Sequence, residues 1–327
     1  MQFRFTRMIV LIVGVSLAAT ACGKYSIGSI RSSKAFKDGL EEYQKADYRS
    51  AVESFERSTQ LSPDFQLAGF AYFYEGNAYD KMYRPTRKGE PDNDANLEKA
   101  VENYRKAIEK LASSDLQQAG QFRNLSFQYL VAAYGPDRLN DFSKAEGVAR
   151  ELIAAEPNEP TNYQALGRLY QDQGRNEEAE QMFIKATEVQ PNNAVGYQLL
   201  ANFYNQTGDF DKTLAAFQKR AEVEPNNPEA WHTMATFYYD KAFRDSRLSP
   251  SVAKGYLQAG VQAEEKALAL NDQYLEAVQY MNMLLTLQAN KEPNIEAKKQ
   301  LLQEATKYYQ KAMQMRAAQS ANPTPKK

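Results

Sequence analysis

The stretch that decides the fold is residues 160–193, PTNYQALGRLYQDQGRNEEAEQMFIKATEVQPNN. Its pattern returns 34 residues later, in residues 194–227, and again in the residues that follow position 228. The recurring columns hold aromatic, aliphatic, small and proline residues: Tyr163, Tyr197 and Trp231; Leu166, Leu200 and Met234; Gly167, Ala201 and Ala235; Tyr170, Tyr204 and Tyr238; Phe183 and Phe217; Pro157, Pro191 and Pro225. Self-similarity at a fixed period is the sequence signature of a repeat architecture. We therefore expect a stacked array of repeats.

In residues 160–193 the pattern resembles the tetratricopeptide repeat, a pair of antiparallel helices joined by a short turn. Gly167 and Ala179 are small, as required where two helices approach closely. Tyr170 and Phe183 are large enough to fill the space between neighbouring repeats. Pro191 ends the second helix, because proline cannot continue it.

Weaker copies of the pattern lie near residues 33–66 and 122–157, and the copy at 194–227 has Thr213 and Arg220 in place of small residues. The resemblance implies an all-α fold, a right-handed α-solenoid of about seven helix pairs that covers residues 33–316. In such an array the first helix of each pair lines the concave face.

Three of the pairs have a lengthened turn within the repeat, at residues 83–96, 242–254 and 290–294. The first two share local sequence, since residues 79–84 read YDKMYR and residues 239–244 read YDKAFR. Two interpretations remain open: a common packing solution for a long turn, or a pair of equivalent docking loops.

Composition excludes several classes of function. The chain has 40 basic and 41 acidic residues, which is not the basic surface that nucleic-acid binding requires. A single cysteine, Cys22, and a single histidine, His232, cannot form a zinc site, a disulfide or a Cys/His catalytic pair. The acidic pairs at 177–178 and 264–265 lie beside lysines in helical sequence, so we expect both on solvated faces. We predict neither enzymatic activity nor a cofactor.

The first 21 residues have the features of a signal peptide: Arg4 and Arg7, an apolar run at 8–15, and small residues up to Ala21. The following Cys22 resembles the lipidated cysteine of bacterial lipoproteins, although Ala19 stands where such sequences usually have leucine. This resemblance implies a lipid anchor on the periplasmic side of the outer membrane. Cleavage after Ala21 without lipidation, which gives a soluble secreted protein, and an uncleaved membrane anchor are the alternatives.

The remaining boundaries follow from composition. Residues 22–32 would be the lipidated cysteine and a flexible tether, and residues 317–327, which end in NPTPKK, a disordered tail. Residues 297–316 form the last amphipathic helix, which we expect to cap the array with inward Leu301, Ala305, Tyr308, Tyr309 and Ala312.

Two candidate binding surfaces follow from the repeat register. An amide-rich peptide groove is expected on the first helices of three successive pairs, because amide side chains both donate and accept hydrogen bonds. Its residues are Gln164, Arg168, Gln171, Gln198, Asn202, Asn205, His232, Thr236 and Tyr239. An amino-terminal aromatic groove is expected from Phe36, Leu40, Tyr43, Phe70 and Phe73, unless these side chains pack against a neighbouring helix.

These features favour a membrane-tethered periplasmic scaffold that binds proteins or peptides of the cell envelope. The sequence resembles the lipoproteins that use such repeats to assemble outer-membrane machinery, including pilotins of the type IV pilus secretin and factors of the barrel-assembly complex. Alternatives are an adaptor that regulates peptidoglycan enzymes, a subunit of an enzyme complex, and self-association through the open ends of the array.

Overall fold

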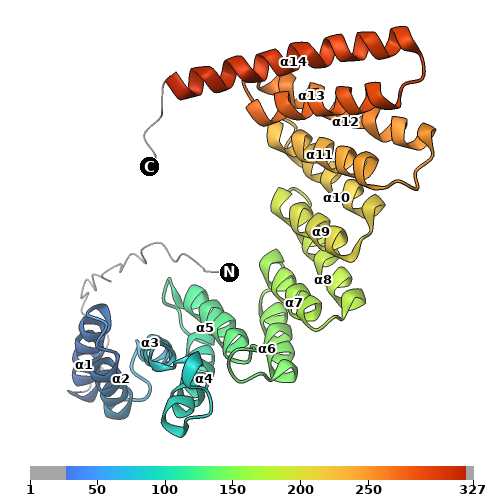
Figure 1. The fold of residues 1–327 in the computed structure, drawn as a ribbon. Helices are drawn as coiled ribbons and strands as arrows, with labels where there is room; N and C mark the ends of the chain where they lie inside the picture. Colours follow the sequence, from blue (N-terminus) through green and yellow to red (C-terminus); the bar gives the residue numbers. More distant parts are fainter. Residues whose placement is uncertain (1–26, 322–327) are drawn as a thin grey trace. The chain divides into compact units, whose positions relative to one another are not determined.

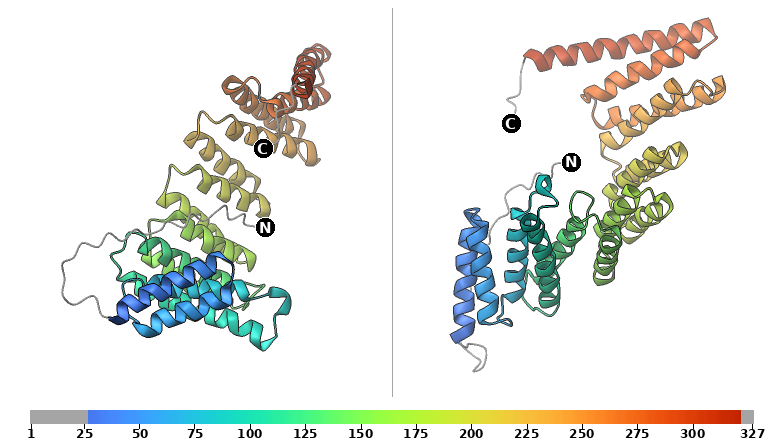
Figure 2. Two further views of the ribbon diagram at one scale, coloured as in Figure 1. Left: turned by 90° about the vertical axis from the view of Figure 1, so that its left-hand side faces the viewer. Right: turned by 60° about the horizontal axis from the view of Figure 1, so that its bottom comes forward.

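The computed structural model describes residues 27–321, and this part of the chain contains fourteen α-helices, one short 3₁₀ helix and no strand (Figures 1 and 2). The α-helices are α1 (Ile27–Gln44), α2 (Tyr48–Leu61), α3 (Ala68–Met82), α4 (Pro91–Ala112), α5 (Ala119–Ala133), α6 (Phe142–Ala155), α7 (Pro160–Asp172), α8 (Asn176–Val189), α9 (Ala194–Thr207), α10 (Phe210–Val223), α11 (Pro228–Arg244), α12 (Pro250–Leu270), α13 (Leu275–Lys291) and α14 (Ile295–Ala321). The 3₁₀ helix η1 is Pro85–Arg87. The predicted all-α architecture of about seven helix pairs is confirmed.

The chain divides into two compact units, one that ends at Val148 and one that begins at Ala149. The first unit contains α1 to α5, the second contains α7 to α14, and α6 spans the division. In the second unit, each pair of helices folds as a hairpin that packs on the next pair along the chain (Figure 1).

Regular repeats begin their first helix with a side-chain cap and a proline or small residue. Asn193 Oδ1 accepts from Val195 N at 3.0 Å, and Asn227 Oδ1 accepts from Glu229 N at 3.0 Å. These bonds satisfy backbone donors that have no partner within the helix. Pro228 occupies the first turn of α11, where its missing N–H removes no helical bond.

The close approach predicted between paired helices is present. A Cβ added at Gly167 in α7 would lie 3.3 Å from the ring of Phe183 in α8, so only glycine fits without displacement. Phe183 also packs on Phe203 of the following pair, with ring centroids 5.3 Å apart. Thr213, which replaces the usual small residue, is accommodated because its buried hydroxyl donates to Asp209 O at 2.7 Å.

The three turns expected to be long are shorter in the structure, because most of the extra residues belong to longer helices. Regular helices α7 to α10 have 13 or 14 residues, whereas α11 has 17, α12 has 21 and α14 has 27. The connection between α11 and α12 is reduced to residues 245–249. In the first unit, η1 and a 22-residue α4 take up the inserted sequence.

Both predicted flexible ends are partly wrong. Helix α1 begins at Ile27, so residues 27–32 are helical, and Ser32 is buried. Helix α14 continues to Ala321, so residues 317–321 are helical as well. The predicted signal peptide, Cys22 and the last six residues lie outside the described part of the chain. Among the helices of residues 27–321, none has both the length and the apolar character needed to span a bilayer.

Candidate peptide-binding face

Exposed amides lie on α9, as the repeat register predicts, and the half-buried Gln171 of α7 contacts them. Gln171 Nε2 of α7 donates to Gln206 Oε1 of α9, and this bond connects the first helices of two successive pairs. Asn202, Asn205 and Gln206 are exposed, and Gln198 Nε2 donates to Asn202 Oδ1 at 2.9 Å. The exposed amides can therefore donate to and accept from the backbone of an extended peptide.

Arg220 of α10, which the repeat register did not assign to the groove, bonds to two of the first helices. Its guanidinium donates to Gln198 Oε1 of α9 and to Glu229 Oε1 of α11, the latter at 3.2 Å. Only 11% of the Arg220 side chain is exposed. Arg220 therefore connects the amides of α9 to α11, the first helix of the next pair. It stands where the repeat usually has a small residue, and this departure from the pattern could have indicated its role in the sequence.

Aromatic side chains contact one another on α11 and α13, the next two first helices. The rings of Tyr239 and Phe243 stack with centroids 5.6 Å apart and planes 10° apart. The edge of Tyr239 also contacts Tyr280 of α13, with centroids 5.8 Å apart. Phe243 is 62% exposed, so this stack presents apolar surface to solvent. A surface aromatic of this kind is suited to anchor a partner side chain.

Two of the predicted groove residues do not lie on this face. Gln164 and His232 are buried, so the assignment of both to the open groove is wrong. His232 Nδ1 lies 2.7 Å from Glu264 Oε1, and the imidazole ring contacts Tyr274 and Tyr280 edge-on.

Two further residues predicted for the groove are at least partly exposed, whereas one glutamate predicted on a solvated face is buried. Arg168 is exposed; Thr236 is half-buried and donates within its own helix to Thr233 O at 2.7 Å. Glu264 is fully buried, which contradicts its predicted position on a solvated face, whereas Glu265 next to it is exposed. Glu177, of the other acidic pair, is exposed as predicted.

The predicted amino-terminal aromatic groove is instead mostly core. Phe36, Phe70 and Phe73 are buried. Phe36 packs on Phe55 with centroids 5.8 Å apart, and both Phe70 and Phe73 contact the ring of Phe122, at 5.0 and 4.8 Å. Helix α5 and the second helix of the first pair therefore cover side chains that the repeat register alone assigned to a surface.

Leu40 and Tyr43, the other two members of the predicted aromatic groove, are half-buried. The hydroxyl of Tyr43 donates to Asn77 Oδ1 of α3, and Asn77 Nδ2 donates to the Tyr104 hydroxyl at 3.3 Å. Burial raises the pKa of the Tyr43 hydroxyl. These contacts hold α1, α3 and α4 together, and the five predicted residues form no open aromatic groove in the described part of the chain.

The two related turn sequences have opposite surroundings. In the first unit, Tyr83 is buried beside Leu97 and Ala133, and Asp80 pairs with Arg138. In the second unit, the matching Phe243 is exposed, and the matching Asp240 pairs with Arg244 of the same helix. The two turns are therefore not equivalent surfaces.

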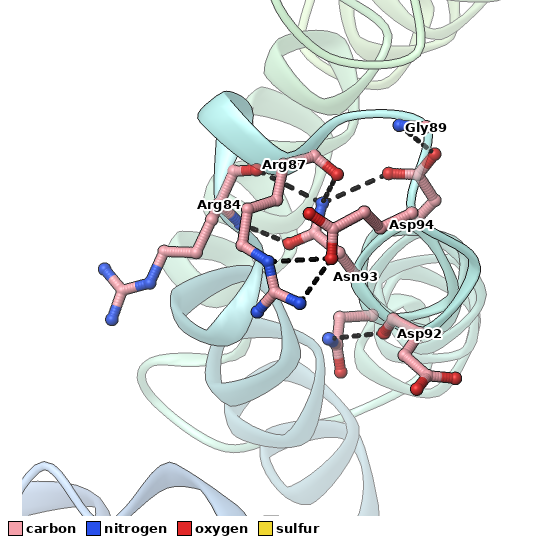
Figure 3. A network of polar contacts seen from close by, with 8 residues as sticks. Arg84, Arg87, Gly89, Asp92, Asn93 and Asp94 are labelled. Carbon is pink, nitrogen blue, oxygen red and sulfur yellow. Dashed lines mark hydrogen bonds and ion pairs between the residues drawn. The ribbon is translucent and has the colours of Figure 1, made fainter.

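Asn93 fixes the first of these turns (Figure 3). Its side chain accepts from Arg84 N at 2.8 Å and donates to the carbonyls of Arg84 and Arg87, both at 3.1 Å. Gly89 N donates to Asp94 Oδ2 at 2.8 Å, and Arg87 pairs with Glu90. The polar groups of this turn are occupied with one another, which favours the packing interpretation for residues 83–96.

Comparison with known proteins agrees with this architecture. Sequence models of the tetratricopeptide repeat match residues 138–203 and 194–237. The chain is a tetratricopeptide repeat protein. This repeat family supplies protein-interaction scaffolds that are generally non-catalytic, and the concave surface of such arrays is the usual place of contact.

Solved structures resemble this tetratricopeptide repeat protein at low sequence identity. The C-terminal part of a TPR repeat-containing protein from Cytophaga hutchinsonii is 14% identical, with a TM-score of 0.50 over 86% of this chain and 98% of that one. A tetratricopeptide repeat protein from Parabacteroides merdae is 16% identical, with a TM-score of 0.45 over 85% of this chain and 99% of that one. At such identity the likeness concerns the fold alone.

One curated relative matches a short stretch of this tetratricopeptide repeat protein. A pentatricopeptide repeat-containing protein of Arabidopsis thaliana is 50% identical over 44 residues, which are 14% of this chain and 10% of the relative. The chain therefore spans about a tenth of that relative's length.

Between residues 27 and 321, no three His, Cys, Asp or Glu side chains are grouped so that they could hold a metal ion.

Proposed function

We propose that this tetratricopeptide repeat protein binds an extended segment of a protein partner along α7, α9 and α11. Three observations carry the proposal. Asn202 and Asn205 are exposed on α9, the exposed Phe243 stacks on Tyr239 of α11, and Arg220 connects these two helices by donating to Gln198 and Glu229. The amides satisfy the backbone of the segment, and the stack covers one of its apolar side chains. Arg220 supports the face by holding Gln198 in place.

The setting that we propose is the periplasmic side of the outer membrane, with the protein attached through a lipid on Cys22. The support is the basic, apolar and small-residue order of residues 4–21 that precedes the single cysteine of the chain. Stable attachment takes more than one acyl chain, which a lipoprotein amino terminus supplies. In this setting the partner is a component of envelope assembly, of the pilus-secretin or barrel-assembly type.

A site-specific photo-crosslinker tests the binding face in cells that express the full chain. We expect a crosslinker at Phe243 or Asn202 to capture one discrete protein. A crosslinker at Lys219, which is exposed on the second helix α10, is the matched control and should not capture it. Equal capture from all three positions, or capture from none, would overturn the assignment of the face.

The identity of the captured protein and a lipid assay test the remaining parts. A secretin or barrel-assembly component supports the assembly role, whereas a peptidoglycan enzyme supports the alternative adaptor role. Cys22→Ser should abolish palmitate labelling and move the protein from the membrane fraction to the soluble fraction. Absence of palmitate labelling from the unaltered chain would exclude the lipid anchor and leave the binding face unaffected.

A further inference from the structure

An apolar stripe lies exposed along one side of α14, the last helix of the array. Ile295, Leu302, Tyr309 and Met313 are 79%, 39%, 56% and 48% exposed. The first three are spaced by seven residues, which places them on the same side of an α-helix. Tyr309 was expected to point inward, and this prediction is wrong. A terminal repeat that caps an array needs a polar outer face, and this side of α14 lacks one.

The buried side of α14 shows which neighbour this stripe lacks. Ala305 and Ala312 are buried, and Asn282 of α13 donates to Ala305 O at 2.8 Å. Ala305, Tyr309 and Ala312 of α14 repeat the spacing of the buried Ala179, Phe183 and Ala186 of α8. This alignment places Tyr309 at the position of Phe183 and Met313 at the position of Thr187.

Those two positions on α8 are covered by the next helix of the array. Phe183 packs on Phe203 of α9, with ring centroids 5.3 Å apart. Thr187 is buried beside Gly196 of α9, where an added Cβ would lie 3.4 Å from the Thr187 methyl carbon. The exposed stripe of α14 is therefore the side on which a tetratricopeptide array receives a further helix.

Charge indicates what kind of helix fits. Lys298, Lys299 and Arg316 border the stripe, and a shallow hollow along its first turns is lined by Ile295, Lys298, Lys299, Leu302, Gln303 and Thr306. At 100° per residue, Glu304 lies on the opposite side of the helix from Ile295. A second copy of α14 would therefore bring cations against cations in either orientation, which is unfavourable.

We propose that the stripe of α14 is a docking surface for an amphipathic helix of a partner protein with carboxylates beside its apolar side. Its apolar side chains cover Leu302 and Tyr309, and its carboxylates pair with Lys298, Lys299 and Arg316. This surface is separate from the amide and aromatic face of α7 to α11, and its occupant is helical where that of the other face is extended.

Two synthetic helical peptides of about 20 residues test the proposal, since helices of this length span the stripe. Both have leucine at the apolar positions and a side-chain staple that holds the helix. One has glutamate at every flanking position, and the other has lysine. Fluorescence anisotropy with the full chain should show the glutamate peptide binding at least about tenfold more tightly than the lysine peptide.

Substitutions in α14 test whether the peptides bind at the stripe. Leu302→Gln should weaken the glutamate peptide by about tenfold or more, because it removes apolar contact area. Lys299→Glu should shift the preference toward the lysine peptide. The matched control is Lys307→Glu, an equally exposed lysine on the other side of α14, which should leave the preference unchanged.

Three outcomes would overturn the proposal. Equal affinity for both peptides would show that the stripe lacks charge selectivity, and binding of neither would exclude a helical occupant. A dimer in sedimentation that Leu302→Gln dissociates would assign the stripe to a second copy of this chain. Circular dichroism of each variant should match that of the unaltered chain, so that lost binding reflects the surface.

Discussion

His232 Nδ1 lies 2.7 Å from Glu264 Oε1, in a contact that joins α11 to α12 with both side chains buried. The second carboxylate oxygen of Glu264 has no hydrogen-bond partner. Burial raises the pKa of the Glu264 carboxyl to about 7, and the hydrogen bond and charge of His232 offset part of this rise. The pair therefore makes the contact between these helices sensitive to pH.

We predict that Glu264→Gln flattens the dependence of stability on pH. The carboxyl pKa is 4.5 when the chain is unfolded and about 7 when it is folded. The stabilisation from its protonated form is therefore complete below pH 4.5 and is lost as the pH rises through 7, a change of about 3 kcal/mol. The glutamine cannot ionise, so this part of the pH dependence should disappear.

The fluorescence of Trp231, the single tryptophan, measures this effect in urea titrations because it lies next to His232 in α11. Glu265→Gln is the control, since this neighbouring side chain is exposed and its replacement should change stability by less than about 0.5 kcal/mol. An identical pH dependence in Glu264→Gln and the unaltered chain would show that the carboxyl does not titrate in this range.

Periodicity could predict the helix pairs but not this buried pair. The columns of Tyr170 and Phe183 specify which side chains fill the space between helices, and both are buried as predicted. Glu264 stands in a sequence with Glu265 and Lys266, which is typical of a solvated helix face. It is buried because it faces His232 of α11 where α11 and α12 pack together, and the local sequence does not show this partner.

A second buried carboxyl, Glu75 in α3, provides an independent test in the first unit. Asn103 Nδ2 of α4 donates to Glu75 Oε1 at 2.9 Å. Burial, with a smaller contribution from Glu56, raises the pKa of the Glu75 carboxyl from 4.5 to about 8. The unfolding free energy should therefore fall as the pH rises from 4.5 to 8.

We expect Glu75→Gln to keep the hydrogen bond from Asn103 and to remove this loss. At pH 8 the variant should be more stable than the unaltered chain by about 4 kcal/mol, while near pH 4.5 the two should be similar. Hydrogen exchange of the α3 amides at both pH values measures the difference. Glu98→Gln, on the exposed side of α4, should have no effect, and slower exchange at pH 4.5 alone would contradict the prediction.

Two glycines of α12 test the close helix contact. A Cβ at Gly260 would lie 2.7 Å from Leu284 Cδ2 and 3.3 Å from Tyr238 Cβ, whereas nothing lies within 4 Å of a Cβ at Gly255. Gly260→Ala should destabilise by about 1–3 kcal/mol through overpacking. Gly255→Ala should stabilise by about 0.5–1 kcal/mol, because alanine favours the helix.

The same fluorescence titration reports this pair of variants, because Lys266 of α12 lies 4.1 Å from the centroid of the Trp231 ring. Opposite signs for two glycine-to-alanine changes in one helix would separate packing from helix propensity. Stabilisation by both substitutions would mean that α12 and α13 have room to move apart.

The shared turn sequence shows why the exposure of its aromatic residue could not be predicted from the sequence. Residues 79–84 and 239–244 differ at only two positions, yet Tyr83 is buried and Phe243 is exposed. The difference arises from partners that are distant in sequence: Leu97 and Ala133 cover Tyr83. The exposure of Asn202 and Asn205 on α9 followed from the register, whereas the burial of Gln164 and His232, which the same register assigned to the groove, did not.

The Asn93 side chain should control how readily the first turn opens. Asn93→Ala removes three hydrogen bonds to the backbone of residues 84 and 87 and leaves these groups without their partner in a partly buried turn. The cost of about 1–3 kcal/mol should raise the population of the opened turn by about 5-fold to 150-fold. Trypsin measures this population directly, because it cleaves after Arg87 and Lys88, which lie in the turn. We expect faster cleavage there than in Asn96→Ala, which loses only one exposed bond to Asp92 O; equal rates would show that η1 holds the turn without Asn93.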